Sequence, residues 1–337
     1  MKRIFSILKV VIPLAFGVFL IWYVFKDLSP KEKSDLFEAM RKANYFWVLV
    51  SVVLGILSHM SRAARWKYSI QPLGKVPRFW NSFFTVMIGY VANLALPRLG
   101  EVTRPGLLAK YEGMSFNKLF GTIVAERVAD LIILACIMAS IVLIEFEMLQ
   151  EMLLGFFENG SGKFSTQKLV ILGVVGFLGL GIFLFLLMSK SSNPILTKVR
   201  EILRGMVEGV QSIIKMEKKG YFLMHTFFIW VMYIGMFSAC FFSLEETSSV
   251  PISGMMAAFV MGSLAIVFVQ GGLGVFPIAI METLILYGVS KTPALAMGWI
   301  IWTSQTLMVI VLGVLSLLFI RIYNKKNVLK EPADHTS

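Results

Sequence analysis

Long apolar stretches separated by short polar segments make up most of this chain. A bilayer core about 30 Å thick needs roughly 20 apolar residues in a helix to cross it. Six stretches reach that length, at about residues 4–25, 45–66, 116–144, 169–188, 221–244 and 294–322. The pattern predicts an all-α integral membrane protein with about six spanning helices.

Two further apolar stretches are interrupted. Trp80–Leu96 leads into ALPRLGEVTRPG, which holds two prolines, two glycines and three charged residues. Met255–Val269 leads into VQGGLGVFP. Each stretch is too short or too interrupted for a straight crossing. Both are therefore predicted to form re-entrant broken hairpins, in which two half-helices enter and leave on one side.

Composition supports a membrane protein. Of 337 residues, 57% are hydrophobic and 15% are charged, whereas soluble domains carry about 25% charged residues. These values exclude a disordered chain and argue against a soluble enzyme. Cys136 and Cys240 both lie in apolar stretches, and no cysteine–histidine spacing indicates a metal. We expect no metal and no cofactor.

The distribution of charge predicts the topology. The net charge is +12, and the basic residues gather between spans rather than in a nucleic-acid-binding stripe. Basic segments follow the second and fourth spans and fill the C-terminal tail, whereas acidic residues follow the third and fifth spans. Because cytoplasmic loops carry an excess of lysine and arginine, both termini are predicted to be cytoplasmic. The mixed segment from Lys26 to Lys42 is then external.

The chain reads as one membrane domain with an internal repeat. The domain is predicted over residues 1–324, followed by a short cytoplasmic tail at 325–337. Apolar positions at helical spacing predict an amphipathic cytoplasmic helix at about 193–219. LPRLGEV at Leu96 matches QGGLGVF at Gln270, and neighbouring segments match at the same offset near 175 residues. Three crossings separate equivalent points, so about 44–145 and 220–322 are predicted to be inverted repeats whose hairpin tips meet near the midplane.

The first interrupted segment carries a candidate binding site. Arg98 and Arg104 flank Glu101, which leaves net positive charge, and arginine binds phosphate in a bidentate manner. Gly100 would allow the backbone to approach an anion closely, and the following half-helix would offer N–H groups. The alternative is an ion-pair lock that holds the hairpin closed.

The third span adds Glu126, Arg127 and Asp130. Glu126 and Asp130 share a helical face at i, i+4. Either they pair with Arg98 or Arg104, or they handle substrate or protons. As a metal-binding pair they are a weak signal, and no catalytic residue is predicted.

The second interrupted segment is far less charged. Its candidate residues are Gln270, Gly272, Gly274 and Glu282. They either line a cavity or allow close helix packing. Gln305 corresponds to Asp130 by the repeat offset. Arg62 and Arg65 are interpreted as interfacial anchors, and His59 and His225 as packed or interfacial residues.

These motifs resemble a known family. The segment LPRLGEVTRPGLLAKYEGMSFNKLFGTIVAERVADL, from Leu96 to Leu131, resembles the signature region of the lysylphosphatidylglycerol synthase transmembrane family, also called flippase-like. RAARW at Arg62 and GGLGVF at Gly271 are similar to its other marks. The resemblance implies movement of a modified lipid between leaflets, and it implicates Arg98, Glu101, Arg104, Glu126, Arg127 and Asp130. The family's soluble aminoacyl-transfer domain has no counterpart here, and Pro277 stands where the glycine motif usually continues into Glu.

The sequence therefore predicts a lipid translocase rather than an enzyme. Its partners would be membrane lipids with a phosphate headgroup, and its location the bacterial cytoplasmic (inner) membrane. One alternative is a non-catalytic partner of an envelope lipid or glycan synthase. Another is an intramembrane lipid-modifying enzyme. No nucleic-acid partner is expected.

Overall fold

The structure is a computed structural model that describes part of the chain, namely residues 15, 18–19, 21–26, 28–96, 98–145 and 209–328. Within these residues every regular element is a helix and no strand occurs. The expected span at 169–188 lies outside the described residues. So do most of the first span and most of the amphipathic helix at 193–219.

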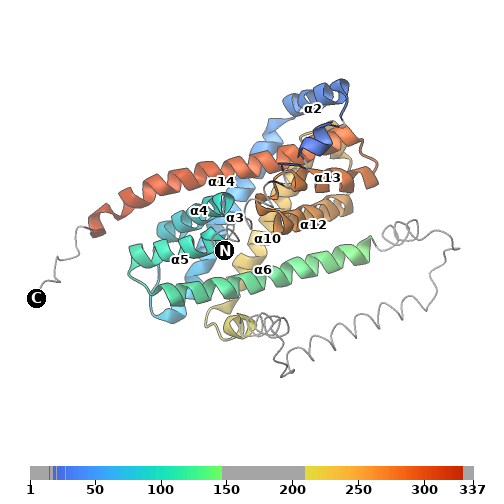
Figure 1. Ribbon diagram of the computed structural model, residues 1–337. Helices are drawn as coiled ribbons and strands as arrows, with labels where there is room; N and C mark the ends of the chain where they lie inside the picture. The colour runs from blue at the N-terminus through green and yellow to red at the C-terminus, as the bar shows by residue number, and fades with distance from the viewer. Residues whose placement is uncertain are drawn as a thin grey trace, which may run out of the picture. The chain divides into compact units, whose positions relative to one another are not determined.

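Figure 1 labels the described helices in chain order. They are α2 (Pro30–Lys42), α3 (Tyr45–Ile70), α4 (Phe79–Ala95), α5 (Leu99–Glu112), α6 (Phe116–Ile144), α10 (Lys219–Phe241), α11 (Glu245–Ser248), α12 (Ile252–Phe268), α13 (Val275–Leu286) and α14 (Lys291–Val328), with the 3₁₀ turns η1 (Gln71–Leu73) and η2 (Gln270–Gly272). The chain divides into two compact units. The first holds Met1–Ile123 and Glu217–Ser337, and the second holds Val124–Met216.

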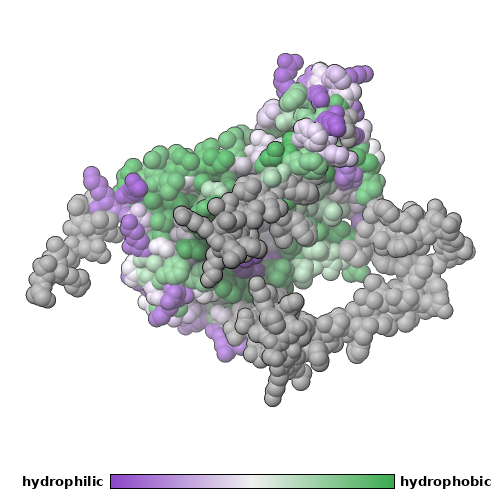
Figure 2. All heavy atoms as spheres, in the orientation of Figure 1, coloured by the Kyte–Doolittle hydropathy of each residue, from purple (hydrophilic) through white to green (hydrophobic). Residues whose placement is uncertain are grey.

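Three of the described helices are long and apolar enough to cross a membrane. They cover Tyr45–Leu73, Lys219–Phe241 and Lys291–Lys325, in agreement with three of the predicted spans. Helix α6 forms where a fourth was expected. The total number of crossings stays a prediction. Apolar side chains cover the visible face over α14, and polar ones gather over α2 and near the far end of α14 (Figure 2).

The segment before α3 is helical, although the sequence suggested only a mixed loop. Ser29 and Glu32 form a capping box at the start of α2: the Ser29 hydroxyl accepts from the Glu32 N–H, and the Glu32 carboxylate accepts from the Ser29 N–H. These hydrogen bonds lower the pKa of Glu32. Helix α2 then packs on α14, with Leu36 fully buried.

Replacing Ser29 with Ala should loosen the start of α2, because an N-terminal N–H loses its acceptor. Amide hydrogen exchange over residues 30–36 should rise, while exchange in α10 stays unchanged. Since the folded-state pKa of Glu32 is lowered, its contribution is present at neutral pH and is lost as the pH falls through that pKa. In the wild-type helix the protection of these amides, measured relative to their intrinsic exchange rates, should fall in the same acidic range.

Helices α3 and α10 form an antiparallel pair. At one end the Asn44 N–H donates to the Ser243 carbonyl over 2.8 Å. At the other end the rings of Tyr68 and Tyr221 stack with centroids 5.5 Å apart. These two helices provide the surface against which the hairpins are arranged.

Two helical hairpins form at the interrupted segments. Helices α4 and α5 pack against each other, as do α12 and α13. Their breaks meet, because α4 contacts η2 and Leu94 lies beside Gly271. Helix α14 runs past both, with Gly298 against Pro277 of α13 and Gly313 against α4. The hairpins therefore lie end to end along α14, with their breaks together and their open ends apart.

The order of elements repeats along the chain. Helices α3, α4, α5 and α6 begin at residues 45, 79, 99 and 116, and α10, α12, α13 and α14 begin at 219, 252, 275 and 291. Each pair is thus offset by 173–176 residues. This spacing matches the offset that the sequence motifs predicted.

Candidate functional site

The first break is built around a strained arginine. Arg98 has φ 63° and ψ 5°, and it is the one non-glycine residue with positive φ in the described part of the chain. In the aligned motifs Arg98 corresponds to Gly272, which has φ 69°. The two breaks therefore share a left-handed residue at the same motif position. Glycine adopts this conformation without a Cβ penalty, so the Arg98 side chain is retained at a cost in backbone energy.

Replacing Arg98 with Gly should raise the stability of the protein by about 1 kcal/mol, because the left-handed conformation penalises a Cβ by roughly that amount. Arg98→Ala removes the same charge but keeps the Cβ. Thermal unfolding in detergent should therefore place the glycine variant above both the wild type and the alanine variant. Equal unfolding temperatures for the glycine and alanine variants would contradict this account of the break.

Gly100 packs against α4 rather than facing an open cavity. A Cβ at Gly100 would overlap the Gly89 carbonyl group, with the carbonyl carbon 2.7 Å away. Its N–H donates to Asn93 Oδ1 over 2.8 Å, and the Glu101 N–H reaches the Arg98 carbonyl over 3.1 Å. Gly100 therefore has a role in closing the hairpin, and its expected role in anion approach stays a prediction. These two N–H groups of the half-helix are already engaged.

Arg104 is held on an aromatic platform. Its guanidinium carbon lies 3.8 Å from the centre of the Trp66 ring, a cation–π contact. Trp66 is fully buried, and its indole N–H donates to Thr122 Oγ1 over 2.8 Å. Thr122 in turn donates to the Leu119 carbonyl. The start of α6 therefore fixes Trp66, and Trp66 orients the Arg104 guanidinium.

The candidate residues with acidic side chains belong to two different compact units of the chain. Glu101 is partly buried in the first turn of α5. Glu126 is buried, Asp130 is partly buried and Arg127 is exposed on α6. Residues 126–130 belong to the second unit, so their pairing with Arg98 or Arg104 stays a prediction.

The second break is built from glycines. Gly271, Gly272 and Gly274 all have positive φ, and the Gly271 carbonyl accepts from the Trp302 indole over 2.7 Å. Glu282 is exposed on α13. Of Gln270 the structure describes only the backbone. This break is thus a turn tied to α14, and the binding role of its candidate residues stays a prediction.

Arg62 and Arg65 are buried, which corrects their interpretation as interfacial anchors. The Arg65 side chain is fully buried; it donates to Thr226 Oγ1 over 3.0 Å and lies over the Phe222 ring. Arg62 donates to the Tyr233 hydroxyl over 3.2 Å, and its guanidinium lies over the Tyr233 ring. Sequence reasoning missed them because they follow an apolar run like ordinary flanking residues. Their spacing on one face of α3 was the available signal.

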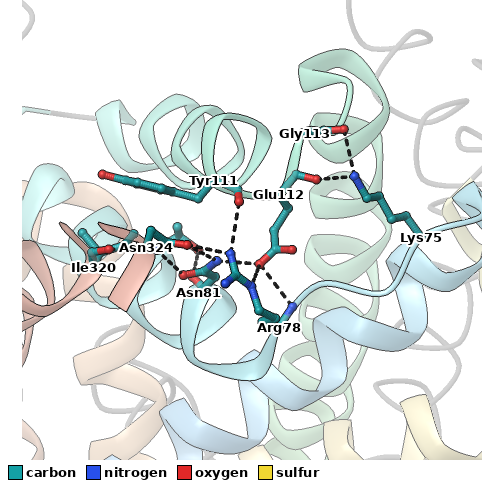
Figure 3. A network of polar contacts seen from close by, with 9 residues as sticks. Lys75, Arg78, Asn81, Tyr111, Glu112, Gly113, Ile320 and Asn324 are labelled. Carbon is teal, nitrogen blue, oxygen red and sulfur yellow. Dashed lines mark hydrogen bonds and ion pairs between the residues drawn. The ribbon is translucent and has the colours of Figure 1, made fainter. Parts of the chain in front are cut away.

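A second polar network, which sequence reasoning also missed, closes the open end of the first hairpin (Figure 3). Arg78 Nε donates to Glu112 Oε1 over 3.0 Å, and Arg78 Nη2 donates to Asn324 Oδ1 over 2.6 Å. Asn81 donates to the same Glu112 oxygen and accepts from Asn324 over 2.7 Å. Lys75 donates to the carbonyls that end α5. The network joins α4, α5 and α14.

These features define an all-helical, multi-pass membrane protein with two broken hairpins. Apart from the hairpin breaks, its polar interior is concentrated on α3 and its neighbours. Among the described residues, no group of three or more histidine, cysteine or acidic side chains could hold a metal.

The chain belongs to the family described as the lysylphosphatidylglycerol synthase TM region, which matches residues 10–313. This confirms the family that its motifs resemble. It is also similar to the UPF0104 membrane protein MJ1595 of Methanocaldococcus jannaschii, with 33% identity over 98 residues. That match covers 28% of this chain and 29% of the relative. No solved structure matches the chain.

Proposed function

We propose that this chain is a lipid translocase that moves a phosphate-bearing lipid, or a lipid-linked intermediate, across the cytoplasmic membrane. The observation that carries the proposal is the meeting of two broken hairpins at their breaks, with Arg98 and Arg104 on the first. The family membership supports it, since the match covers the membrane region of a lipid-modifying protein.

The broken backbone is the first physical argument. Hydrocarbon cannot satisfy unpaired N–H and C=O groups, so an irregular segment at membrane depth must be buried in protein or line a polar path. Two such breaks come together here. Broken helices that meet within a repeated architecture are typical of secondary transporters. We infer that the two halves are inverted across the membrane and that the hairpins are re-entrant.

The arginines supply the affinity for phosphate. Arg104 is oriented by Trp66, and such prior ordering lowers the entropy lost on binding. Arg98 is exposed at the break. Its strained backbone is expected where a side chain has a function. Glu101 would set the local charge, while the acyl chains remain in lipid beside apolar helices such as α14.

The charge pattern orients the molecule. Lys75 and Arg78 lie at the open end of the first hairpin, and basic loop residues favour the cytoplasmic side. The first hairpin would therefore enter from the cytoplasm and the second from outside. Both termini would then be cytoplasmic, as the sequence predicts.

The test is to extract the protein in native-lipid discs and to identify bound lipids by mass spectrometry. The Arg98→Ala/Arg104→Ala double variant is compared with wild type, and Arg41→Ala, on the polar helix α2, is the matched control. Selective enrichment of one phosphate-bearing lipid, lost only in the double variant, is expected. Identical bulk lipid profiles would overturn the site, and the protein would then fit better as a partner subunit of an envelope synthase.

A further inference from the structure

A line of buried polar residues follows one face of α3 along most of its length. Its members, here called the α3 stripe, are each less than 9% exposed and lie 3, 4 or 7 positions from another member; they are Ser51, Ser58, His59, Ser61, Arg62, Arg65 and Ser69. Such spacing places them on one helical face. From Ser51 to Ser69 the rise is about 27 Å at 1.5 Å per residue. That length approaches the thickness of the hydrocarbon core.

The opposite face of the same helix is apolar and exposed. Leu49, Val53 and Leu57 are all at least 40% exposed. Helix α3 therefore presents hydrocarbon-like side chains outward and polar side chains inward. This is the reverse of a helix in a water-soluble protein, and it places the stripe inside the helical bundle.

Several members of the stripe are buried without a hydrogen-bond partner. Ser58 Oγ, Ser69 Oγ and His59 Nδ1 are buried and make no hydrogen bond. Several other helical hydroxyls bond to a carbonyl three or four residues earlier, namely Thr85, Ser140, Thr226, Ser263 and Thr283, whereas Ser82 Oγ on the adjoining helix α4 also lacks a partner. A buried polar group without a partner is destabilising, because it has lost its hydrogen bonds to water without replacing them. Three on one face indicate a surface whose partner arrives in another state of the protein.

The neighbours of the stripe add cations and aromatic rings. Arg62 and Arg65 lie over the rings of Tyr233 and Phe222 on α10. The His59 ring lies 4.9 Å from that of Tyr90 on α4. The Trp66 ring, on the same face of α3, makes the cation–π contact with Arg104 of α5. The stripe thus passes from the Ser51–Gln305 hydrogen bond with α14 to the helices of the first hairpin.

We propose that the α3 stripe is the path along which the phosphate-bearing headgroup crosses the membrane. This inference rests on the proposed translocase function and assigns the path to residues beyond the hairpin breaks. The serine hydroxyls and the His59 imidazole would hydrogen-bond the headgroup oxygens. Arg62 and Arg65, which lie in the half of the stripe nearer Ser69, would balance the phosphate charge there. The acyl chains would remain outside the bundle.

The first test removes the two hydroxyls that lack partners. Ser58→Ala/Ser69→Ala is reconstituted in vesicles of phosphatidylcholine with a trace of NBD-labelled phosphatidylglycerol, and dithionite quenching measures lipid movement. We expect the rate to fall by about tenfold, comparable to the loss of a hydrogen bond to a charged group. The thermal transition should stay unchanged or rise, because unsatisfied buried groups are removed. Ser263→Ala, which deletes a hydroxyl bonded to a carbonyl, should retain the wild-type rate.

The second test measures access to the stripe. Ser58→Cys and Ser69→Cys are made with Cys136 and Cys240 replaced by Ala, and they are treated with the cationic thiol reagent MTSET. A polar path predicts labelling at both positions. Val53→Cys, on the lipid-facing side of α3, should stay unlabelled even though its side chain is far more exposed in the structure.

The outcomes separate the path from the function. Wild-type transport rates in the serine variant, or thiols at 58 and 69 that resist MTSET, would overturn the path while leaving the translocase standing. A wild-type protein that neither enriches nor moves a phosphate lipid would overturn the translocase itself. Uptake of ³²P-phosphate into the same vesicles without lipid movement would replace the lipid headgroup with the free anion, and it would overturn the path as proposed.

Discussion

Gly100→Ala should prevent the first hairpin from closing. The added Cβ would lie 2.7 Å from the Gly89 carbonyl carbon and 2.8 Å from Asn93 Cγ. Both contacts are shorter than real Cβ contacts, and the first is with backbone, which cannot rotate away. We expect the free energy of unfolding to fall by about 3 kcal/mol or more. This is at or above the upper end of the destabilisation found when cores are overpacked. Lipid enrichment in native-lipid discs should fall with it.

Gly106→Ala is the matched control, because it makes the same change on the same helix. Its Cβ would meet only the Phe116 ring at 4.0 Å. Alanine is favoured over glycine within a helix by about 1 kcal/mol, so this variant should be as stable as wild type or more stable. Thermal unfolding in detergent compares the two. If the Gly100→Ala protein unfolds at the same temperature as the Gly106→Ala control, α4 and α5 do not approach closely at this point.

Local sequence signals predicted that both apolar runs are interrupted. The first break was expected around Arg98 and Glu101 and the second at 270–274; in the structure α4 ends at Ala95, α5 begins at Leu99, and η2 covers Gln270–Gly272. That the hairpins are re-entrant stays a prediction. The repeat offset was also readable, because two related segments keep their element spacing even where residues differ. The inversion and the crossings are properties of the bilayer arrangement, and they stay predictions.

The interior partners could not be predicted from sequence. Arg65 contacts Thr226, 161 positions away, and Arg78 contacts Asn324, 246 positions away. Neither pair shares a helix, so no periodic pattern links its members. The packing of Gly100 on Gly89 was not predicted either, because close approach of a backbone can serve a second helix as readily as an anion.

The two polar clusters of the first unit occupy different positions along the hairpin. Arg104 and the α3 stripe lie along its inner length, whereas Arg78, Glu112 and Asn324 close its open end against α14. A hairpin that must expose an inner path to one side needs its open end held in register. The network at Glu112 therefore determines whether the first hairpin stays docked on α14.

Glu112→Ala should release that end. The Glu112 carboxylate accepts from Arg78 and from Asn81, and its side chain is only 9% exposed. Removing one partner of a buried ion pair typically costs about 3–5 kcal/mol. We expect a destabilisation at the lower end of this range, since the Arg78 side chain is 34% exposed and water screens its charge in part. Glu112→Gln keeps the volume and one acceptor, so it should lose less.

The exposed pair Glu38–Lys42 on α2 supplies the control. Glu38→Gln should leave the thermal transition essentially unchanged, because solvent screens an exposed helix pair. A cysteine pair introduced at Arg78 and Asn324, in a background lacking the native cysteines, then tests docking directly. Cross-linking should restore the thermal transition of Glu112→Ala, because it replaces the lost contact between α4 and α14. A transition that stays low would mean that Glu112 stabilises α5 alone, and that the open end of the hairpin is held by apolar packing with α14.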